Sequence, residues 1–168
     1  MRHSNVQNFN QGFTVLETLV VIVMVGIIAS LTAPSFLAWN QKKQVDSATA
    51  AIEGSIKEAQ REAMSQASSC DVSFNIANPE KPIVTSGINC LTTGDRQLEN
   101  VTLTPSDTAI SFNSLGESSS DTAGNVTIVV THVSNPNLKK CLVVSKPLGL
   151  IGSGEYTGTG ASEANCKP

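Results

Sequence analysis

Residues 12–38 of the chain read GFTVLETLVVIVMVGIIASLTAPSFLA. From Phe13 to Ala38 almost every residue is apolar, and Glu17 is the sole ionisable side chain. This run exceeds the ~20 residues that a helix needs to span the hydrocarbon core of a bilayer. The sequence therefore predicts a membrane-spanning helix over residues 13–38.

The residues before this run, 1–12, are polar and end in Gly12. A secretory signal peptide would be cut after its apolar stretch, next to small residues. Here the small residue precedes the stretch, and no A-x-A-type site stands out after it. We therefore expect the mature protein to keep the apolar helix.

Glu17 is the anomaly within the apolar run. A carboxylate in the middle of a membrane costs a few kcal/mol and is usually retained for a specific partner. Glu17 lies only four residues after Phe13. Two interpretations therefore stay open from the residues alone: a carboxylate solvated at the membrane interface, or one that pairs with a partner.

The whole motif, Gly12 to Glu17 before a long apolar helix, resembles the prepilin processing motif of type IV pilins and type II secretion pseudopilins. In that family a dedicated peptidase cuts after the glycine on the cytoplasmic side and methylates the new N-terminus. The resemblance implies cleavage between Gly12 and Phe13 and N-methylation of Phe13. It also implies that Glu17 pairs with the N-terminal ammonium of a neighbouring subunit, and that Pro34 is the family's helix-kinking proline.

An amphipathic pattern continues the helix beyond the apolar run, over residues 39–69. Apolar residues recur every three or four positions, and charged residues occupy the other faces, as in a helix that buries one stripe. The stripe consists of Val45, Ala48, Ile52, Ile56, Ala59 and Ala63.

Residues 70–168 change to the two-residue periodicity of β-strands and are predicted to form an antiparallel head. The expected strands are at Val72–Ile76, Ile83–Ser86, Val101–Thr104, Ala109–Phe112, Val126–Thr131 and Cys141–Ser145. Turns are expected at Asn78-Pro79, Thr93-Gly94-Asp95, Pro105-Ser106-Asp107, the Gly116–Gly124 loop, Asn135-Pro136-Asn137 and Pro147. The segment from Gly152 to Lys167 is predicted to be an irregular loop pinned by Cys166. The fold class is therefore α+β, with the helix stripe covering one face of the sheet.

Four cysteines, Cys70, Cys90, Cys141 and Cys166, indicate two disulfides in an exported domain. None of them belongs to a C-x-x-C pair, which makes a structural zinc site improbable. Four cysteines allow three pairings. We favour Cys70–Cys90 and Cys141–Cys166, because each closes a short local loop.

A second resemblance concerns the far end of the chain. A helix ending in KEAQREAM, then strands, then Cys141-Leu142-Val143-Val144-Ser145 with Gly149 behind it is similar to the FimT and H-class minor pseudopilin group. Some members of that group bind DNA and carry arginines after the glycine, whereas here Leu150-Ile151-Gly152 follows. The candidate nucleic-acid contacts are Lys139, Lys140 and Lys146, the only basic cluster. With a formal net charge of −3 and a pI near 5.3, DNA remains an alternative partner that the charge disfavours.

No catalytic motif is present, so we expect no enzyme, no metal and no cofactor. The sequence contains no G-x-S-x-G, P-loop or H-E-x-x-H pattern. His132 is expected to be packed or solvated, because it has no partner motif. Glu117 and Asp121 flank three serines, which suits a solvated loop better than a calcium site.

The resemblance implies a structural subunit, a minor pilin or pseudopilin, of a type IV pilus or type II secretion filament. Its partners would be other pilins or pseudopilins, the prepilin peptidase/methyltransferase, an inner-membrane assembly platform, and membrane lipid before assembly. The chain would reside in the bacterial inner membrane with a cytoplasmic N-terminus, and later in a periplasmic or cell-surface filament. The alternative function is a pilus-associated DNA-binding subunit.

Overall fold

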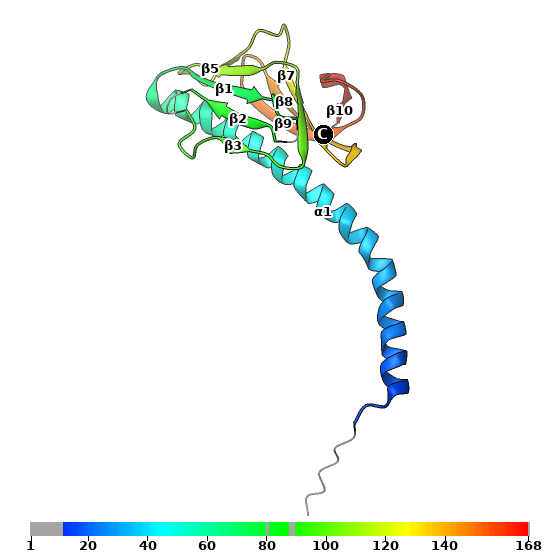
Figure 1. The fold of residues 1–168 in the computed structure, drawn as a ribbon. Helices are drawn as coiled ribbons and strands as arrows, with labels where there is room; N and C mark the ends of the chain where they lie inside the picture. Colours follow the sequence, from blue (N-terminus) through cyan, green and yellow to red (C-terminus); the bar gives the residue numbers. More distant parts are fainter. Residues whose placement is uncertain (1–11, 80, 88–89, 168) are drawn as a thin grey trace, which may run out of the picture. The chain divides into compact units, whose positions relative to one another are not determined.

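The structure is a computed structural model that describes residues 12–79, 81–87 and 90–167, and of residues 31–34 only the backbone. The chain divides into two compact units, residues 1–39 and residues 40–168, which are described separately below. One long helix, α1 (Val15–Gln66), contributes to both units (Figure 1). We call residues 40–168 the head.

Local signals define both ends of α1. The Thr14 side chain accepts a hydrogen bond from the N–H of Glu17 (3.3 Å), so Thr14 is the N-cap. At the other end, Ala67 adopts a left-handed conformation (φ 49°), and the N–H of Ser68 donates to the carbonyl of Ala63 (3.2 Å). This is the hydrogen bond that closes a Schellman-type C-cap. The helix is therefore a few residues shorter than the predicted 13–69.

The head contains two five-stranded sheets in which every pairing is antiparallel. The first sheet has the order β3-β2-β1-β5-β6, with β1 Cys70–Asn75, β2 Ile83–Ser86, β3 Arg96–Gln97, β5 Ala109–Phe112 and β6 Ser118–Ser119. The second has the order β10-β9-β8-β7-β4, with β4 Val101–Pro105, β7 Val126–His132, β8 Asn135–Ser145, β9 Leu150–Tyr156 and β10 Cys166–Lys167. Figure 1 shows these strands along the second half of α1. The expectation of a single sheet was wrong.

The predicted helix stripe forms the centre of the core of the head. All six of its residues, Val45, Ala48, Ile52, Ile56, Ala59 and Ala63, are 6% exposed or less. They belong to one apolar cluster with side chains of both sheets, among them Val72 and Phe112 of the first sheet and Ile128 and Leu142 of the second. The helix therefore joins two sheets that share no strand.

The C-terminal segment is partly regular where we expected an irregular loop, and only residues 157–162 lack helix and strand. Strand β9 pairs with β8 from Lys140–Glu155 to Ser145–Leu150, a short 3-10 helix follows at Glu163–Asn165, and β10 pairs with β9. Gly152 and Gly154 have little intrinsic preference for strands, but the edge of β8 supplies hydrogen-bond partners for residues 150–155. Tertiary pairing here overrides local composition.

The turn between β7 and β8 also differs from the prediction. Asn135-Pro136-Asn137 has typical turn residues, yet it belongs to β8, and Asn135 pairs with His132. A register shift between Thr131 and His132 lets the chain reverse at residues 133–134. Such a bulge bends the strand and displaces the turn.

The two disulfides are the pairs that the sequence analysis favoured. Cys70 at the start of β1 is bonded to Cys90, and Cys141 of β8 is bonded to Cys166 of β10. They close loops of 20 and 25 residues, for which chain entropy predicts about 3 kcal/mol of stabilisation each. Each bond fastens a different sheet.

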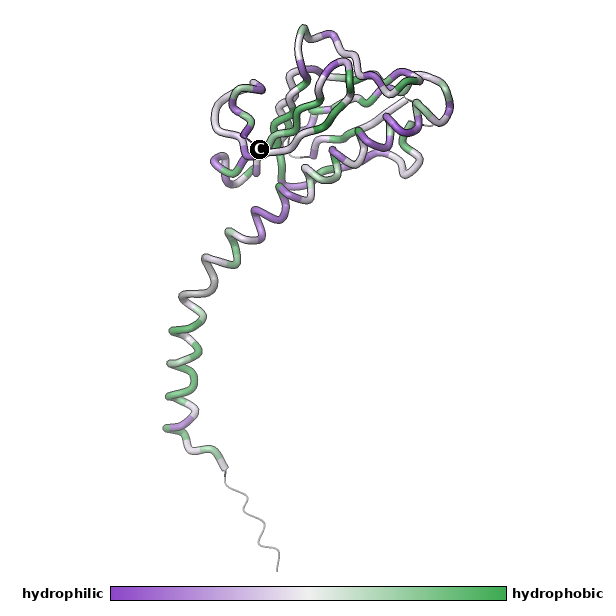
Figure 2. The backbone as a smooth tube through the Cα atoms, turned by 180° about the vertical axis from the view of Figure 1, so that it is seen from behind, coloured by the Kyte–Doolittle hydropathy of each residue, from purple (hydrophilic) through white to green (hydrophobic). Residues whose placement is uncertain are grey.

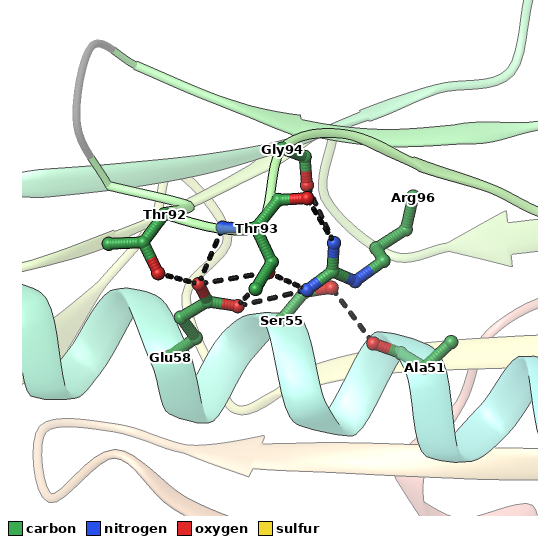
Figure 3. Close-up of polar contacts among 7 residues, drawn as sticks. All are labelled: Ala51, Ser55, Glu58, Thr92, Thr93, Gly94 and Arg96. Atoms are coloured by element: carbon green, nitrogen blue, oxygen red, sulfur yellow. Dashed lines mark hydrogen bonds and ion pairs between the residues drawn. The ribbon is translucent and has the colours of Figure 1, made fainter.

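A carboxylate on α1 holds the segment between Cys90 and β3 (Figure 3). Glu58 accepts hydrogen bonds from the Thr92 hydroxyl (2.6 Å) and from the N–H and hydroxyl of Thr93 (3.1 and 3.0 Å). Arg96 forms an ion pair with Glu58 (3.0 Å) and donates to the carbonyls of Thr93 and Gly94. This arrangement, which we call the Glu58 clamp, fixes a segment without regular structure to the helix.

The clamp lowers the pKa of Glu58. Partial burial raises the pKa of this carboxyl, but the hydrogen bonds from Thr92 and Thr93 and the charge of Arg96 together outweigh burial, so the pKa lies below its ordinary value. Asp107 shows the same balance. Burial raises the pKa of this carboxyl, but hydrogen bonds, led by those from Thr122, lower it by more, so the pKa lies below its ordinary value. Carboxylates with a depressed folded pKa stabilise the fold above their unfolded pKa and lose this contribution as the pH falls.

We predict that Glu58→Gln lowers the free energy of unfolding of the head by about 1–2 kcal/mol at pH 7, because charged hydrogen bonds become neutral ones. The difference from the unchanged protein should shrink as the pH falls below about 4, the ordinary range of a glutamate. Urea unfolding at several pH values measures it.

Glu53→Gln is the matched control. Glu53 lies on the same helix and pairs with Lys57 at 2.5 Å, but the Lys57 side chain is half exposed. Exposed pairs of this kind contribute a few tenths of a kcal/mol. A Glu58→Gln effect that is constant from pH 3 to pH 7 would contradict the clamp.

Candidate functional site

The apolar half of α1 exposes its large side chains, as far as the structure describes them. Figure 2 shows this half of the helix as a largely green, hydrophobic segment. Together with Phe13, which precedes the helix, the exposed large apolar residues are Val15, Leu16, Leu19, Val20, Val21, Ile22, Val23, Met24, Val25, Ile27, Ile28, Phe36, Leu37 and Trp39. In the described part of the chain, α1 is the helix long and apolar enough to cross a membrane, judged by length and composition. Such a surface requires lipid or other helices as its surroundings.

Two hydroxyl groups in this segment, those of Thr18 and Ser30, are satisfied inside the helix. The Thr18 hydroxyl donates to the carbonyl of Val15 (2.8 Å), and the Ser30 hydroxyl donates to the carbonyl of Ile27 (2.7 Å). Such local bonds make hydroxyl residues tolerable in an apolar environment. These two side chains therefore need no external partner.

Glu17 differs from the hydroxyl residues. Its backbone N–H is bonded to Thr14, but its carboxylate is exposed and has no hydrogen bond or ion pair to any residue that the structure describes. A carboxylate in an apolar segment is stable only with a counter-charge or with water. The first turn of this apolar helix thus carries one carboxyl group, that of Glu17, without a partner among the described residues.

Gly12 and Phe13 precede the helix and are exposed. A bond outside regular structure is accessible to a peptidase, as terminal segments usually are. Residues 1–11 of the predicted leader lie outside the described residues. The helix runs through Pro34, whose side chain is not among those described, so the bend at this position stays a prediction.

The N-cap is a feature that the sequence analysis missed. Thr14-Val15-Leu16-Glu17 has the T-x-x-E spacing of a capping box, a signal for a helix start that is visible in the sequence. It places the first turn of α1 directly after Phe13, with Glu17 in that turn. The carboxylate and the predicted new N-terminus therefore lie close along the chain.

The structure does not gather the three candidate DNA-contacting lysines into one patch. Lys139 donates to the carbonyl of Gly158 (2.8 Å), and Lys140 pairs with Asp46 of α1 (2.7 Å). Lys146 donates to the Ser120 hydroxyl (2.9 Å) and lies six residues beyond Lys140, roughly 20 Å along an extended strand. Each of the three is engaged by its own partner.

The other titratable candidates, His132 and Glu117, make hydrogen bonds within the head. His132 is buried and lies between the Gln44 side chain, 2.9 Å from its Nε2, and the N–H of Ser134, which donates to its Nδ1 (3.0 Å). Glu117 accepts a hydrogen bond from Asn113 (2.7 Å). Among the described residues, no three His, Cys, Asp or Glu side chains are placed to hold a metal ion.

The sequence analysis also missed a contact between two loops of the head, those that contain Gly116 and Gly149. Gln60 of α1 donates to the carbonyls of Gly116 (2.8 Å) and Gly149 (3.4 Å), and so holds two loops together. Both glycines have positive φ (80° and 65°), and a Cβ at Gly149 would lie 2.8 Å from the Gly116 carbonyl. The neighbouring Leu115 and Leu148 are mostly exposed. Only the tertiary structure brings these distant loops together.

Comparison with known proteins places the fold. No protein-family model matches the sequence, and no curated protein matches it. The structure is similar to a crystal structure of the type IV minor pilin FimU of Pseudomonas aeruginosa, with a TM-score of 0.54 and 14% identity. This match covers 74% of the chain and 97% of the FimU structure. A second crystal form of FimU gives a TM-score of 0.46 at 13% identity, covering 68% of this chain and 90% of that one.

The predicted fold class is thereby confirmed, with one long N-terminal helix and antiparallel strands in the head. The chain has a pilin fold, similar to that of the FimU structure.

Proposed function

We propose that the chain is a structural subunit of a pilin-type filament, held in the membrane by residues 13–38 until it assembles. The supporting observation is the contrast between the two parts of α1. The stripe from Val45 to Ala63 is buried within the head, whereas the large apolar residues from Phe13 to Trp39 remain exposed. A helix with its own folded head and an uncovered apolar half suits lipid first and neighbouring helices later.

Glu17 would direct the assembly step. In an apolar filament core its charge requires a partner, and the N-terminal ammonium of a neighbouring subunit is a counter-charge of the right sign. Cleavage before Phe13 would create that ammonium four residues before Glu17. Pairing between subunits would neutralise both charges and fix the axial position of one helix against the next.

We place the subunit among the minor pilins of a type IV pilus, the class to which the similar FimU protein belongs. A type II secretion pseudopilin is the alternative. The N-terminus would be cytoplasmic, where the prepilin peptidase/methyltransferase acts, and the inner-membrane assembly platform would extract the subunit from the lipid. The role is structural rather than enzymatic. Copy number in sheared filaments separates a minor from a major subunit.

We predict that the mature protein begins with N-methylated Phe13. The reason is the position of small, exposed Gly12 before the apolar helix, at the spacing of the processing motif from Glu17. Mass spectrometry of the protein purified from filaments reads the N-terminus directly. A retained leader in filament-borne protein, or a cut after the apolar run, would contradict the proposal.

We predict that Glu17→Gln inserts into the membrane normally but enters filaments at least about tenfold less, because the partner ammonium is left unpaired in an apolar core. Immunoblots of membranes and of sheared filaments measure the two steps. Glu53→Gln, which changes the same charge on the head part of α1, is the control and should assemble normally. Equal incorporation of Glu17→Gln would mean that this carboxylate is merely interfacial.

The DNA-binding alternative predicts a different result. Without Arg2 and Glu17, residues 40–168 contain ten Lys and Arg against thirteen Asp and Glu. Because phosphate contacts supply most non-specific affinity, we expect the head to bind duplex DNA weakly, with a shallow salt dependence of about −0.9 per contact. Gel-shift titrations at low and near-physiological salt test this. Tight binding that is lost on changing Lys139, Lys140 and Lys146 to alanine would favour a DNA receptor.

A further inference from the structure

The end of the head that follows the apolar helix in sequence is built from α1 and the turn between β7 and β8. Gln44 lies 2.9 Å from His132, and the Asn135 amide donates to Gln41 (3.2 Å). Gln41 comes two residues after Trp39, where the apolar run has ended. Within the head, these contacts join the turn between β7 and β8 to the first residues of the head part of α1.

Four lysines occur at this end. Lys42 and Lys43 are exposed on α1, and Lys139 and Lys140 are half-buried in β8. Lys42, Lys139 and Lys140 line one hollow of about 180 Å³, although they come from segments almost a hundred residues apart. We call Lys42, Lys43, Lys139 and Lys140 the basic end.

The carboxylates near the basic end are fewer than its lysines, so they do not neutralise its positive charge. Asp46 pairs with Lys140, Glu155 lines the same hollow, and Glu99 lines a neighbouring groove with Lys43. Four lysines therefore face three carboxylates here, whereas the head as a whole has an excess of acidic residues. Positive charge is thus concentrated at one end of an acidic head.

The aromatic residues before the basic end suggest where it lies. Phe36 and Trp39 are exposed, with ring centroids 6.0 Å apart. Aromatic residues at the end of an apolar helix are typical of the membrane–water interface. Lys42 is three residues after Trp39 in the sequence, about one helical turn beyond this interface.

We propose that the basic end binds the phosphate groups of anionic phospholipids while the subunit waits in the membrane. The inference rests on the proposed membrane insertion of residues 13–38. Juxtamembrane lysines gain roughly a fivefold preference each for an anionic surface at low ionic strength. Binding there would hold the head against the bilayer, and extraction into a filament would have to break these contacts.

Lipid fits this surface better than a soluble polyanion. The helix would confine the lysines to the headgroup layer, where phosphates are present at a high effective concentration. A few lysines then suffice, whereas an acidic head would have to bind DNA from dilute solution against its own net charge.

The test uses the full chain reconstituted in vesicles of phosphatidylcholine, with and without phosphatidylglycerol. Each lysine is acylated with an amine reagent, and the rates are measured by mass spectrometry. We expect Lys42 to react several-fold more slowly in the anionic vesicles, because lipid phosphates shield it. Lys57, fifteen residues further along the same helix, is the internal reference and should react at the same rate in both.

A second measurement keeps the full chain in the anionic vesicles and compares two variants. The enrichment of a fluorescent phosphatidylglycerol around Trp39, measured by energy transfer at low salt, should weaken about fivefold on Lys42→Gln and stay unchanged on Lys57→Gln. Equal slowing of Lys42 and Lys57, or equal loss in the two variants, would overturn the proposal. Equally tight retention of a DNA duplex would also overturn it. Neither measurement involves filaments, so a failure here differs from a failure of Glu17-dependent assembly.

Discussion

The structure depends on how α1 buries apolar residues in two different surroundings. Its first part is apolar on every face and fills no core of its own. Its second part has one buried apolar stripe, and this stripe holds two sheets that share no strand. Because a helix keeps its residues on fixed faces, the stripe from Val45 to Ala63 determines which strands can be covered. Removing the second part of the helix would leave both sheets without a common core.

Two carboxylates hold the parts of the head that have little regular structure. Glu58 on α1 binds the segment after Cys90, and Asp107, between β4 and β5, binds Thr122, between β6 and β7. Both carboxylates are held as anions by several donors rather than by one ion pair, which is why hydrogen bonds outweigh burial in setting each pKa. A small core is thereby supplemented by polar contacts at its edges.

Much of this arrangement could be predicted from local sequence, because the deciding signals are periodic. The spacing of three and four residues in the stripe marks the buried face of α1. The alternation at Val72 and Phe74 marks β1, and β-branched runs mark β7. The cysteines could be paired because nearby partners close short loops. The remaining features depend on contacts between distant residues. Strand β9 forms because β8 offers an edge, and the clamp joins Glu58 to Arg96, 38 residues later, with no local pattern to mark the pair. Glu17, by contrast, is conspicuous in the sequence, whereas its proposed partner belongs to another molecule.

The position of α1 at the start of the chain has a consequence for biogenesis. Ribosomes make the stripe before any strand that covers it, and β10, which carries Cys166, is made last. In the proposed membrane-anchored subunit, the head would not close until β10 has crossed the membrane. During that interval the apolar stripe would stay uncovered beside an anchored helix, and the chain would then be most prone to aggregate. Chaperones of the receiving compartment would meet this stripe before they meet a folded head.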